Sequence, residues 1–171
     1  MTLRQVLAIG LLVAVGVGAH APPTSKPGVD WPQFRGIRAG GVAEGYPLAA
    51  AWDIPSGRGV RWKTAIAGLG LASPIVWGDL VCLSTSISGQ KDAGLRVGLY
   101  GDVTPVTDDS QHEWRIYCLD KKSGAVRWQQ AVLRAVPKIK RHTKSSHANS
   151  TLATEGERLI LFFGSEGLYR Y

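Results

Sequence analysis

The chain has 171 residues, of which 44% are hydrophobic and 19% charged, and its formal net charge is +7. These proportions are ordinary for a globular protein. Its 21 Gly and six Trp stand against a single Met, and no segment repeats its apolar positions convincingly at the 3.6-residue period of a helix. The sequence therefore excludes a fold built on long amphipathic helices and favours short strands joined by tight turns.

The first 21 residues have the pattern of an export signal. Arg4 gives a positive start, residues 6–17 are apolar throughout, and both Val17-Gly18-Ala19 and Ala19-His20-Ala21 have the small-residue form of a cleavage site. The apolar stretch suits a signal-peptide core of about 7–15 residues and is shorter than the roughly 18–20 residues that span a bilayer. We predict a signal peptide at 1–21 and an exported protein, periplasmic or secreted to the cell surface. An uncleaved anchor or a buried strand is the alternative.

Two cysteines, Cys82 and Cys118, lie inside apolar strand patterns. Export would place them in a compartment where disulfides persist. A bridge needs Cα atoms within about 7 Å of each other, a distance that pairing of the two strands would provide. A cysteine in such a pattern is also commonly a small buried hydrophobic residue, so the sequence leaves the choice between a bridge and two thiols open.

After the leader, the chain divides into a tether and a repeated region. Residues 22–58, with Pro first and then Gly prominent, are expected to form an extended N-terminal segment. Residues 59–171 repeat themselves, and self-similarity at a period of several tens of residues indicates a propeller or a solenoid. The matching pieces are 59–66 and 125–132, 73–79 and 150–157, 80–83 and 159–163, and 116–117 and 168–169.

The spacing of the repeats predicts an insertion. Val81 and Leu159 are further apart in sequence than Tyr117 and Tyr169, so the first repeat holds extra residues between its second and third strands. The extra residues fall within about 86–112, a polar stretch that is rich in glycine. Loops of this length are usually either functional or disordered.

Two turns predict hairpins within the repeated region. Gly78-Asp79 supplies the backbone freedom that a two-residue hairpin turn requires. At the second turn the Asp120 carboxylate can accept backbone N–H bonds, and Gly124 can adopt a positive φ. The segments 114–119 and 125–132 are therefore expected to be antiparallel neighbours.

The segment Tyr117-Cys118-Leu119-Asp120-Lys121-Lys122-Ser123-Gly124-Ala125-Val126-Arg127-Trp128 resembles the repeat of the pyrroloquinoline-quinone-like (PQQ-like) β-propeller family. That repeat is an apolar strand, Asp, two residues, Thr or Ser, Gly, three residues and Trp. The opening Trp31-Pro32-Gln33-Phe34-Arg35-Gly36 and the strand start Ser73-Pro74 are similar to exported members of the same family. The resemblance covers residues 31–171.

The resemblance implies an all-β fold, a partial β-propeller of four-stranded antiparallel blades. Complete propellers have about four to eight blades, and this chain would supply fewer than two, so we expect it to be a fragment of a longer protein. Asp120, Gly124, Trp128 and Trp62 occupy the structural positions of the repeat. The two tryptophans are expected to dock into a neighbouring blade, since one ring buries about 150–250 Å².

Three functions compete, and the sequence leaves open whether the protein is an enzyme. The favoured hypothesis is a non-catalytic scaffold or interaction module. The second is the N-terminal part of a quinoprotein dehydrogenase with PQQ and Ca²⁺. Such enzymes typically carry an adjacent Cys-Cys pair, which this sequence lacks, and Ca²⁺ requires six to eight oxygen ligands, for which only Asp108-Asp109 forms an acidic cluster.

The third hypothesis is a propeller that binds a ligand or metal through His142 and His147. Histidine is the commonest metal ligand, but these two lie among Ser, Thr and Asn side chains that could simply satisfy a polar connection. No other catalytic or cofactor-binding pattern is present.

The expected partners follow from charge and export. A basic run without an intervening acid could bind an acidic surface, or could be a solvated loop. We predict protein partners or an extracytoplasmic polymer, no nucleic acid, and no transmembrane span after cleavage of the leader. The run consists of Arg134, Lys138, Lys140, Arg141 and Lys144.

Overall fold

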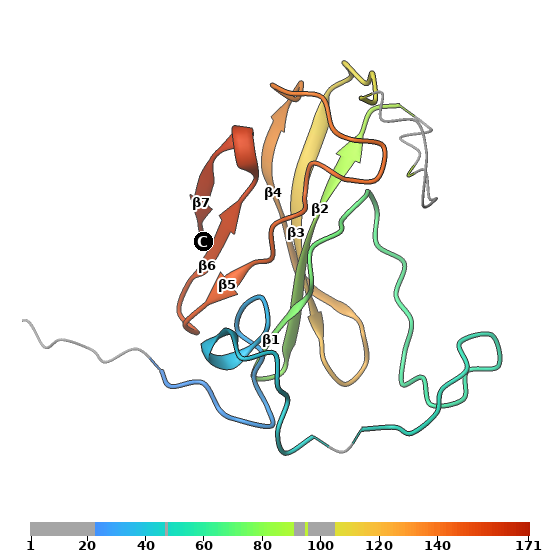
Figure 1. Cartoon of the computed structure of the whole chain (residues 1–171), viewed down its shortest axis with the longest axis vertical. Coiled ribbons are helices and arrows are strands. Elements are labelled where there is room, and N and C mark those ends of the chain that lie inside the picture. Colours follow the sequence, from blue (N-terminus) through green and yellow to red (C-terminus); the bar gives the residue numbers. More distant parts are fainter. Residues whose placement is uncertain (1–22, 47, 91–94, 96–104) are drawn as a thin grey trace, which may run out of the picture.

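The computed structural model describes residues 23–46, 48–90, 95 and 105–171 (Figure 1). The predicted signal peptide lies outside these residues, as do parts of the predicted insertion, 91–94 and 96–104. Within the described ranges the chain forms two antiparallel β-sheets and two short 3₁₀ turns, η1 (Ile37–Ala39) and η2 (Gly164–Glu166). The all-β prediction is confirmed. In the same ranges no helix has the length and apolar character needed to cross a membrane.

The first sheet is a four-stranded meander in which each strand pairs with the next along the chain. The predicted antiparallel pairing of 114–119 with 125–132 is confirmed by the ladder between the third and fourth strands. The strands are β1 (Ile75–Trp77), β2 (Leu80–Ser88), β3 (His112–Asp120) and β4 (Val126–Ala135).

Turn chemistry explains two of these hairpins. Between β1 and β2, Gly78 has a φ of 56° and Asp79 has no positive φ; a positive φ at the first central position alone indicates a type II′ hairpin turn. Between β3 and β4, the Asp120 Oδ1 accepts hydrogen bonds from the backbone N–H groups of Lys122 and Ser123 at 3.0 and 2.8 Å. Gly124 follows with a φ of 74°. Both turns therefore use the residues from which they were predicted.

The second sheet is a three-stranded meander (Figure 1). Its strands are β5 (Ala153–Thr154), β6 (Leu159–Phe162) and β7 (Leu168–Arg170). Hydrogen bonds between Leu159 and Tyr171 continue the β6–β7 ladder beyond the strands. The sequence repeat thus corresponds to two meanders in which each strand pairs with the next along the chain. The second meander has no fourth strand among the described residues.

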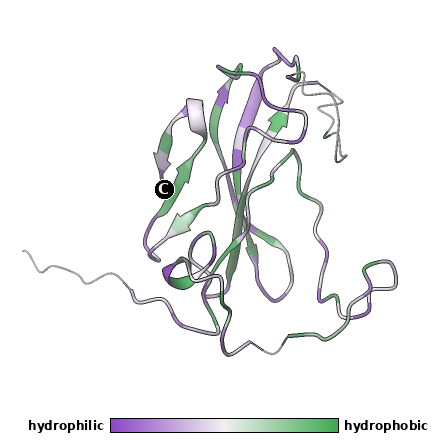
Figure 2. Ribbon diagram, in the orientation of Figure 1, coloured by the Kyte–Doolittle hydropathy of each residue, from purple (hydrophilic) through white to green (hydrophobic). Residues whose placement is uncertain are grey.

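One apolar core joins the two sheets. Trp114 of β3 is fully buried, and its ring centroid lies 6.5 Å from that of Phe163, which follows β6. Ile75 of β1 and Leu161 of β6 belong to the same buried cluster. Figure 2 shows apolar residues along β6 and along the lower part of β3. Because buried aromatic rings contribute the largest apolar areas, the Trp114–Phe163 contact is central to holding the sheets together.

A disulfide connects Cys82 and Cys118. The two residues are direct partners in the β2–β3 ladder, and their Cα atoms are 4.1 Å apart. The question that the sequence left open is thereby answered in favour of a bridge. The bond lies within the buried core, since both residues are almost fully shielded from solvent.

The N-terminal segment is joined to both sheets. Trp31 exchanges two backbone hydrogen bonds with Val76 of β1, at 2.7 and 2.9 Å, and Thr154 of β5 donates its N–H to the Pro32 carbonyl at 2.9 Å. Asp30, which is buried, accepts the Gly78 N–H with its Oδ1 at 2.7 Å. Residues 30–32 therefore link β1, the first turn and β5.

Candidate functional site

Trp62 is packed flat against the β3–β4 turn. A Cβ atom added to Gly124 would lie 2.5 Å from the Trp62 ring, so the ring occupies the space that any other residue would need. The Trp62 Nε1–H donates to the Lys121 carbonyl at 2.9 Å, and the Thr64 hydroxyl donates to the Gly124 carbonyl at 2.7 Å. The Trp62 ring therefore holds the β3–β4 turn in place. Trp128, the residue equivalent to Trp62 in the repeat, lies in β4 just after this turn.

Trp128 reaches from β4 toward the second sheet. Its ring centroid lies 6.2 Å from that of Tyr171, which extends β7, and 39% of the residue is exposed. Together they border a hollow of about 290 Å³ between the sheets, which Leu159 also lines. The two repeat-related tryptophans thus each extend away from their own segment toward the following sheet.

A third tryptophan makes the same kind of contact between the sheets. Trp77, at the end of β1, packs on Gly156, where a Cβ atom would lie 2.5 Å from the indole ring. Gly156 lies in the turn between β5 and β6. The first turn of one sheet therefore contacts the first turn of the next.

Asp120 holds the β3–β4 turn together through its side chain. In addition to its backbone bonds, its Oδ2 accepts from Arg127 Nη2 at 2.6 Å. The Ser123 backbone N–H and the Arg127 guanidinium lower the pKa of Asp120, because hydrogen bonds and an adjacent positive charge stabilise the carboxylate. This carboxylate is a structural acceptor.

A second carboxylate lies at the opposite end of β3 in a buried polar cluster. Asp108 accepts hydrogen bonds from the hydroxyls of Ser88 and Ser110, both at 2.6 Å. His112 Nδ1 contacts the Ser110 carbonyl at 3.0 Å, and its Nε2 lies 3.4 Å from Asp108 Oδ2. Burial alone would raise the pKa of Asp108, but the serine hydrogen bonds outweigh it and the pKa is lowered.

His147 adjoins this cluster from the connection between β4 and β5. Its ring centroid is 5.1 Å from that of His112 in an edge-on arrangement, and its carbonyl accepts the Trp114 Nε1–H at 2.9 Å. Burial, followed by the charges of His112 and Arg141, lowers the pKa of His147. The imidazole is therefore held neutral near pH 7.

His142 and His147 line the same cavity, a hollow of about 210 Å³ between residues 139–150 and 162–165. His142 Nδ1 accepts the Lys144 backbone N–H at 3.0 Å, which engages one of its two ring nitrogens in a local turn. No group of three or more His, Cys, Asp or Glu side chains suited to a metal occurs among the described residues. Two imidazoles could still bind a small ligand in this hollow.

Glu166 introduces a buried negative charge beside the cavity wall. Its Oε1 accepts from the Lys138 backbone N–H at 3.0 Å and from the Ser165 hydroxyl at 2.9 Å, and its Oε2 lies 3.9 Å from Lys138 Nζ. Oε2 is buried without a hydrogen bond in the described part of the chain. Glu166 thus connects Lys138 of the basic run to the turn before β7.

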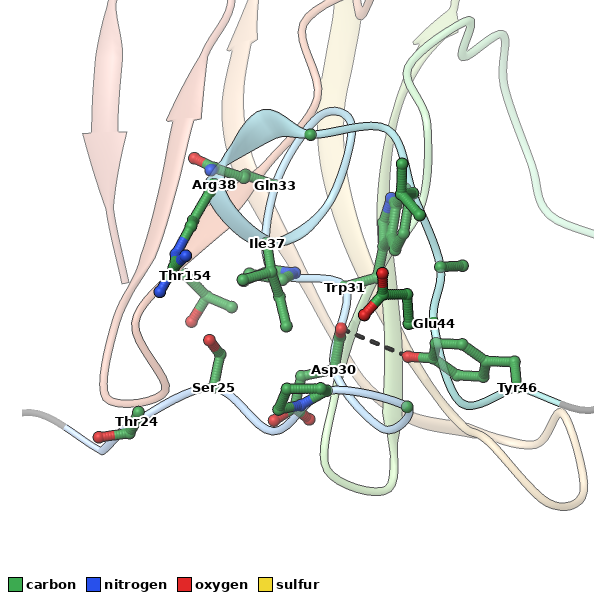
Figure 3. Close-up of a pocket in the computed structure, with 16 residues that line it drawn as sticks. Thr24, Ser25, Asp30, Trp31, Gln33, Ile37, Arg38, Glu44, Tyr46 and Thr154 are labelled. Carbon is green, nitrogen blue, oxygen red and sulfur yellow. Dashed lines mark hydrogen bonds between the residues drawn. The ribbon is translucent and has the colours of Figure 1, made fainter.

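A hollow of about 860 Å³ lies within the N-terminal segment and is bordered by Thr154 (Figure 3). Figure 3 shows Ile37 and Arg38 on one wall, Ser25 on another, and Glu44 beside Tyr46. The Tyr46 hydroxyl donates to the Asp30 carbonyl at 3.4 Å. Burial, and then the Asp30 charge, raises the pKa of Tyr46. The mixed lining suits a small polar molecule.

The sequence analysis named the histidines and the repeat residues, considered Asp108 only as part of an acidic pair for Ca²⁺, and missed the buried acids Asp30 and Glu166. Asp30 precedes the Trp31-Pro32 opening, and Asp108 stands two residues before Ser110, a spacing that allows the side chain to accept a nearby N–H. Glu166 follows β6 without a comparable local pattern. All three of these acids accept hydrogen bonds from backbone N–H groups.

Comparison with known proteins gave no match to a protein-family model and no match to a solved structure. The functional argument therefore rests on the chain's own contacts.

Proposed function

We propose that the protein is an exported, non-catalytic scaffold of PQQ-like β-propeller repeats that presents a basic surface to an acidic extracytoplasmic polymer. The observation that carries the scaffold is the placement of Trp62 on the Gly124 turn. A residue of one repeat closes the turn of the next, as expected where successive units depend on contacts with their neighbours. Trp77 on Gly156 supports the same relation between the two sheets.

The engagement of the buried acids supports a structural function for them. Asp30 accepts backbone N–H groups of Lys26 and Gly78, both at 2.7 Å. Asp108 accepts from two serine hydroxyls and contacts His112. A general acid or base must present its proton to a substrate within hydrogen-bonding distance, whereas these carboxylates use their oxygens to hold turns and strand ends in place.

The basic run supports the acidic partner. Arg134 and Lys138 have 62% and 64% of their side chains exposed, and Lys140 and Lys144 are exposed as well. Glu113 and Glu166 neutralise part of this charge through their contacts with Arg134 and Lys138. A surface of predominantly positive sign attracts polyanions in a salt-dependent manner.

The experiment measures retention of the purified chain on dextran sulfate beads, with neutral dextran beads as the reference. We expect retention at low salt that falls as salt rises, and a several-fold loss in the double variant Lys140→Gln/Lys144→Gln. The matched control, Lys121→Gln/Lys122→Gln, removes the same charge at the β3–β4 turn and should retain the wild-type behaviour. Equal losses of retention in the two variants would show that binding depends only on net charge and would contradict a defined binding surface. Export is tested separately by fusing residues 1–21 to a periplasmic reporter.

A second candidate is ligand binding by His142 and His147, which the shared cavity favours. Titration with Zn²⁺ in a calorimeter tests it, with the variants His142→Ala and His147→Ala as probes. Binding that is lost in both variants supports a shared site, and binding that is unchanged in both rejects it. The quinoprotein alternative has no supporting contact in the described residues; retention of PQQ and Ca²⁺ by the purified protein would revive it.

A further inference from the structure

The hollow between residues 139–150 and 162–165 is lined by hydrogen-bond donors and positive charge. Its described lining contains Lys140, Arg141, His142, His147 and four serines, and no Asp or Glu side chain. Its volume of about 210 Å³ is below the roughly 300–1,000 Å³ of pockets that hold drug-sized ligands. The hollow therefore suits one small acceptor group rather than a whole organic molecule.

His142 has a donor available for such a group. Its Nδ1 accepts the Lys144 backbone N–H at 3.0 Å, and a neutral ring nitrogen that accepts a hydrogen bond carries no proton. The imidazole proton therefore lies on the other ring nitrogen, Nε2. In this tautomer His142 can donate to an oxygen atom, whereas binding a metal ion through Nε2 would require breaking the bond to Lys144.

His147 provides a second ring with an unused donor. Neither of its ring nitrogens has a hydrogen-bond partner among the described residues, and its ring is packed edge-on against that of His112. Because burial lowers the pKa of His147, the ring is neutral near pH 7 and carries one N–H. A half-buried N–H without a partner costs free energy, which a ligand oxygen would recover.

Positive charge borders the hollow on the side of the basic run. Lys140 is exposed and lines the hollow, and Arg141 lines it as a buried residue whose guanidinium stays charged. Arg141 Nη1 donates to the Ser145 carbonyl at 3.0 Å, which holds the loop that forms one wall. The lining therefore combines a fixed loop with two cationic side chains.

Two buried acids near the hollow are already engaged by other groups. Glu166 Oε2 lies 3.9 Å from Lys138 Nζ, and its Oε1 accepts from the Lys138 backbone N–H. Asp108 accepts hydrogen bonds from two serine hydroxyls, and its Oδ2 lies 3.4 Å from His112 Nε2. Neither acid is part of the described lining. The charge that the hollow itself presents is positive.

We propose that this hollow binds a single oxyanion group, a sulfate ester or a carboxylate, of the acidic polymer. The inference rests on the proposed polymer binding and names the place where one acidic group is held. The exposed basic run attracts a polyanion over a distance. The two imidazole N–H groups and the hydroxyls of Ser145 and Ser150, which also line the hollow, give directed hydrogen bonds to its oxygens. Lys140 belongs to both and connects them.

The first experiment follows the imidazole signals of the full chain by NMR at pH 7 during titration with sodium sulfate or sodium acetate, at constant ionic strength in chloride. We expect saturable shifts of the His142 and His147 signals with sulfate, acetate or both, and the responding salt identifies the oxyanion. His142→Ala should raise the Kd at least fivefold. His142→Gln, whose amide retains an N–H donor, should stay within about twofold of the wild type, as should the distant control Lys121→Gln/Lys122→Gln. No saturable shift with either salt, or an unchanged Kd in His142→Ala, would overturn the proposal.

The second experiment separates this site from the proposed function. His142 is exposed, so its variants should keep the wild-type melting temperature, which circular dichroism checks. On dextran sulfate beads His142→Ala should elute at lower salt than the wild type, and His142→Gln should elute with it. Retention of the wild type without an NMR shift by either salt would reject the hollow and leave the basic surface standing. Oxyanion binding by a chain that the beads do not retain would reject polymer binding and leave the hollow as an oxyanion site.

Discussion

The contact between Trp62 and Gly124 predicts that adding a single methyl group to the turn should be unusually costly. In Gly124→Ala the new Cβ would lie 2.5 Å from the Trp62 ring and 2.8 Å from the Thr64 hydroxyl. The φ of 74° adds a second penalty, since a left-handed conformation costs an L-residue about 1–2 kcal/mol. The variant must therefore either strain the turn or expel the indole.

The magnitude follows from the two contributions. Overpacking costs about 1–3 kcal/mol, and the left-handed backbone adds about 1–2 kcal/mol. We expect Gly124→Ala to lower the free energy of unfolding by about 2–5 kcal/mol in total; expelling the indole instead would forfeit its hydrogen bond to Lys121. Gly78→Ala is the matched control, because Gly78 also lies in a hairpin turn with a positive φ, 56°, but has no atom within 4 Å of an added Cβ. It should lose only about 1–2 kcal/mol.

Urea unfolding monitored by circular dichroism measures both variants, and a double-mutant cycle with Trp62→Ala identifies the source of the difference. In the Trp62→Ala background, Gly124→Ala should cost little more than Gly78→Ala does in the wild type. A full cost of Gly124→Ala in that background would refute the clamp. Equal costs of Gly124→Ala and Gly78→Ala in the wild type would refute it as well.

Four further predictions concern the core and the charged groups. Replacing Cys82 and Cys118 by alanine should lower the free energy of unfolding by about 4 kcal/mol, from the loop entropy of a separation of 36 residues; urea curves with and without reductant should differ for the wild type and coincide for the variant. Trp114→Phe removes the donor to the half-buried His147 carbonyl and should cost about 1–3 kcal/mol in the same assay. Because the folded pKa of His147 is lowered, its contribution to stability is present above the unfolded pKa of about 6.5 and is lost as pH falls below it. The melting temperature should therefore drop between about pH 7 and pH 5, less so in His147→Gln. Because the folded pKa of Asp120 is lowered, its contribution to stability is present above the unfolded pKa of about 4 and is lost as pH falls below it. Asp120→Asn should therefore have a lower melting temperature at pH 7 and a melting temperature that changes less between about pH 5 and pH 3. A larger change than in the wild type would contradict this assignment.

The parts of the fold that the sequence predicts are those determined by neighbouring residues. Gly78 and the segment Asp120–Gly124 carry the backbone freedom and the side-chain acceptor that their hairpins need, within two to five residues of chain. A hairpin then brings its flanking strands together without further information. The β3–β4 pairing is predictable for this reason.

The disulfide required information that local patterns do not contain. Cys82 and Cys118 face each other because β2 and β3 pair in one particular register, across a connection that includes the predicted insertion. A shift of one residue would turn the side chains to opposite faces. The apolar pattern of each strand indicated burial, but the register between them depends on the packed core.

The candidate sites illustrate the same division. His142 and His147 were selected for their residue type, and the cavity that they share arises from the path of the β4–β5 connection against residues 162–165. The His112–Asp108 contact depends on Ser88 at the end of β2, a residue distant in sequence. Sequence patterns identified polar positions, whereas the partner of each one was set by strands that meet only in the folded chain.

The strand at the outer position of each repeat, such as β4, contacts the following repeat and so makes neighbouring repeats depend on each other. Within the described residues, β4 and the repeat-related segment 60–66 are of the outer type, and the inner meanders are β1–β3 and β5–β7. β4 pairs with the meander that precedes it, while its Trp128 extends toward the meander that follows. Applied to 60–66, the same rule places Trp62 on the first meander, as observed, and leaves its ladder groups for a preceding meander. A residue of one repeat therefore holds the β3–β4 turn of the next repeat, so the stability of each repeat depends on contacts with its neighbour.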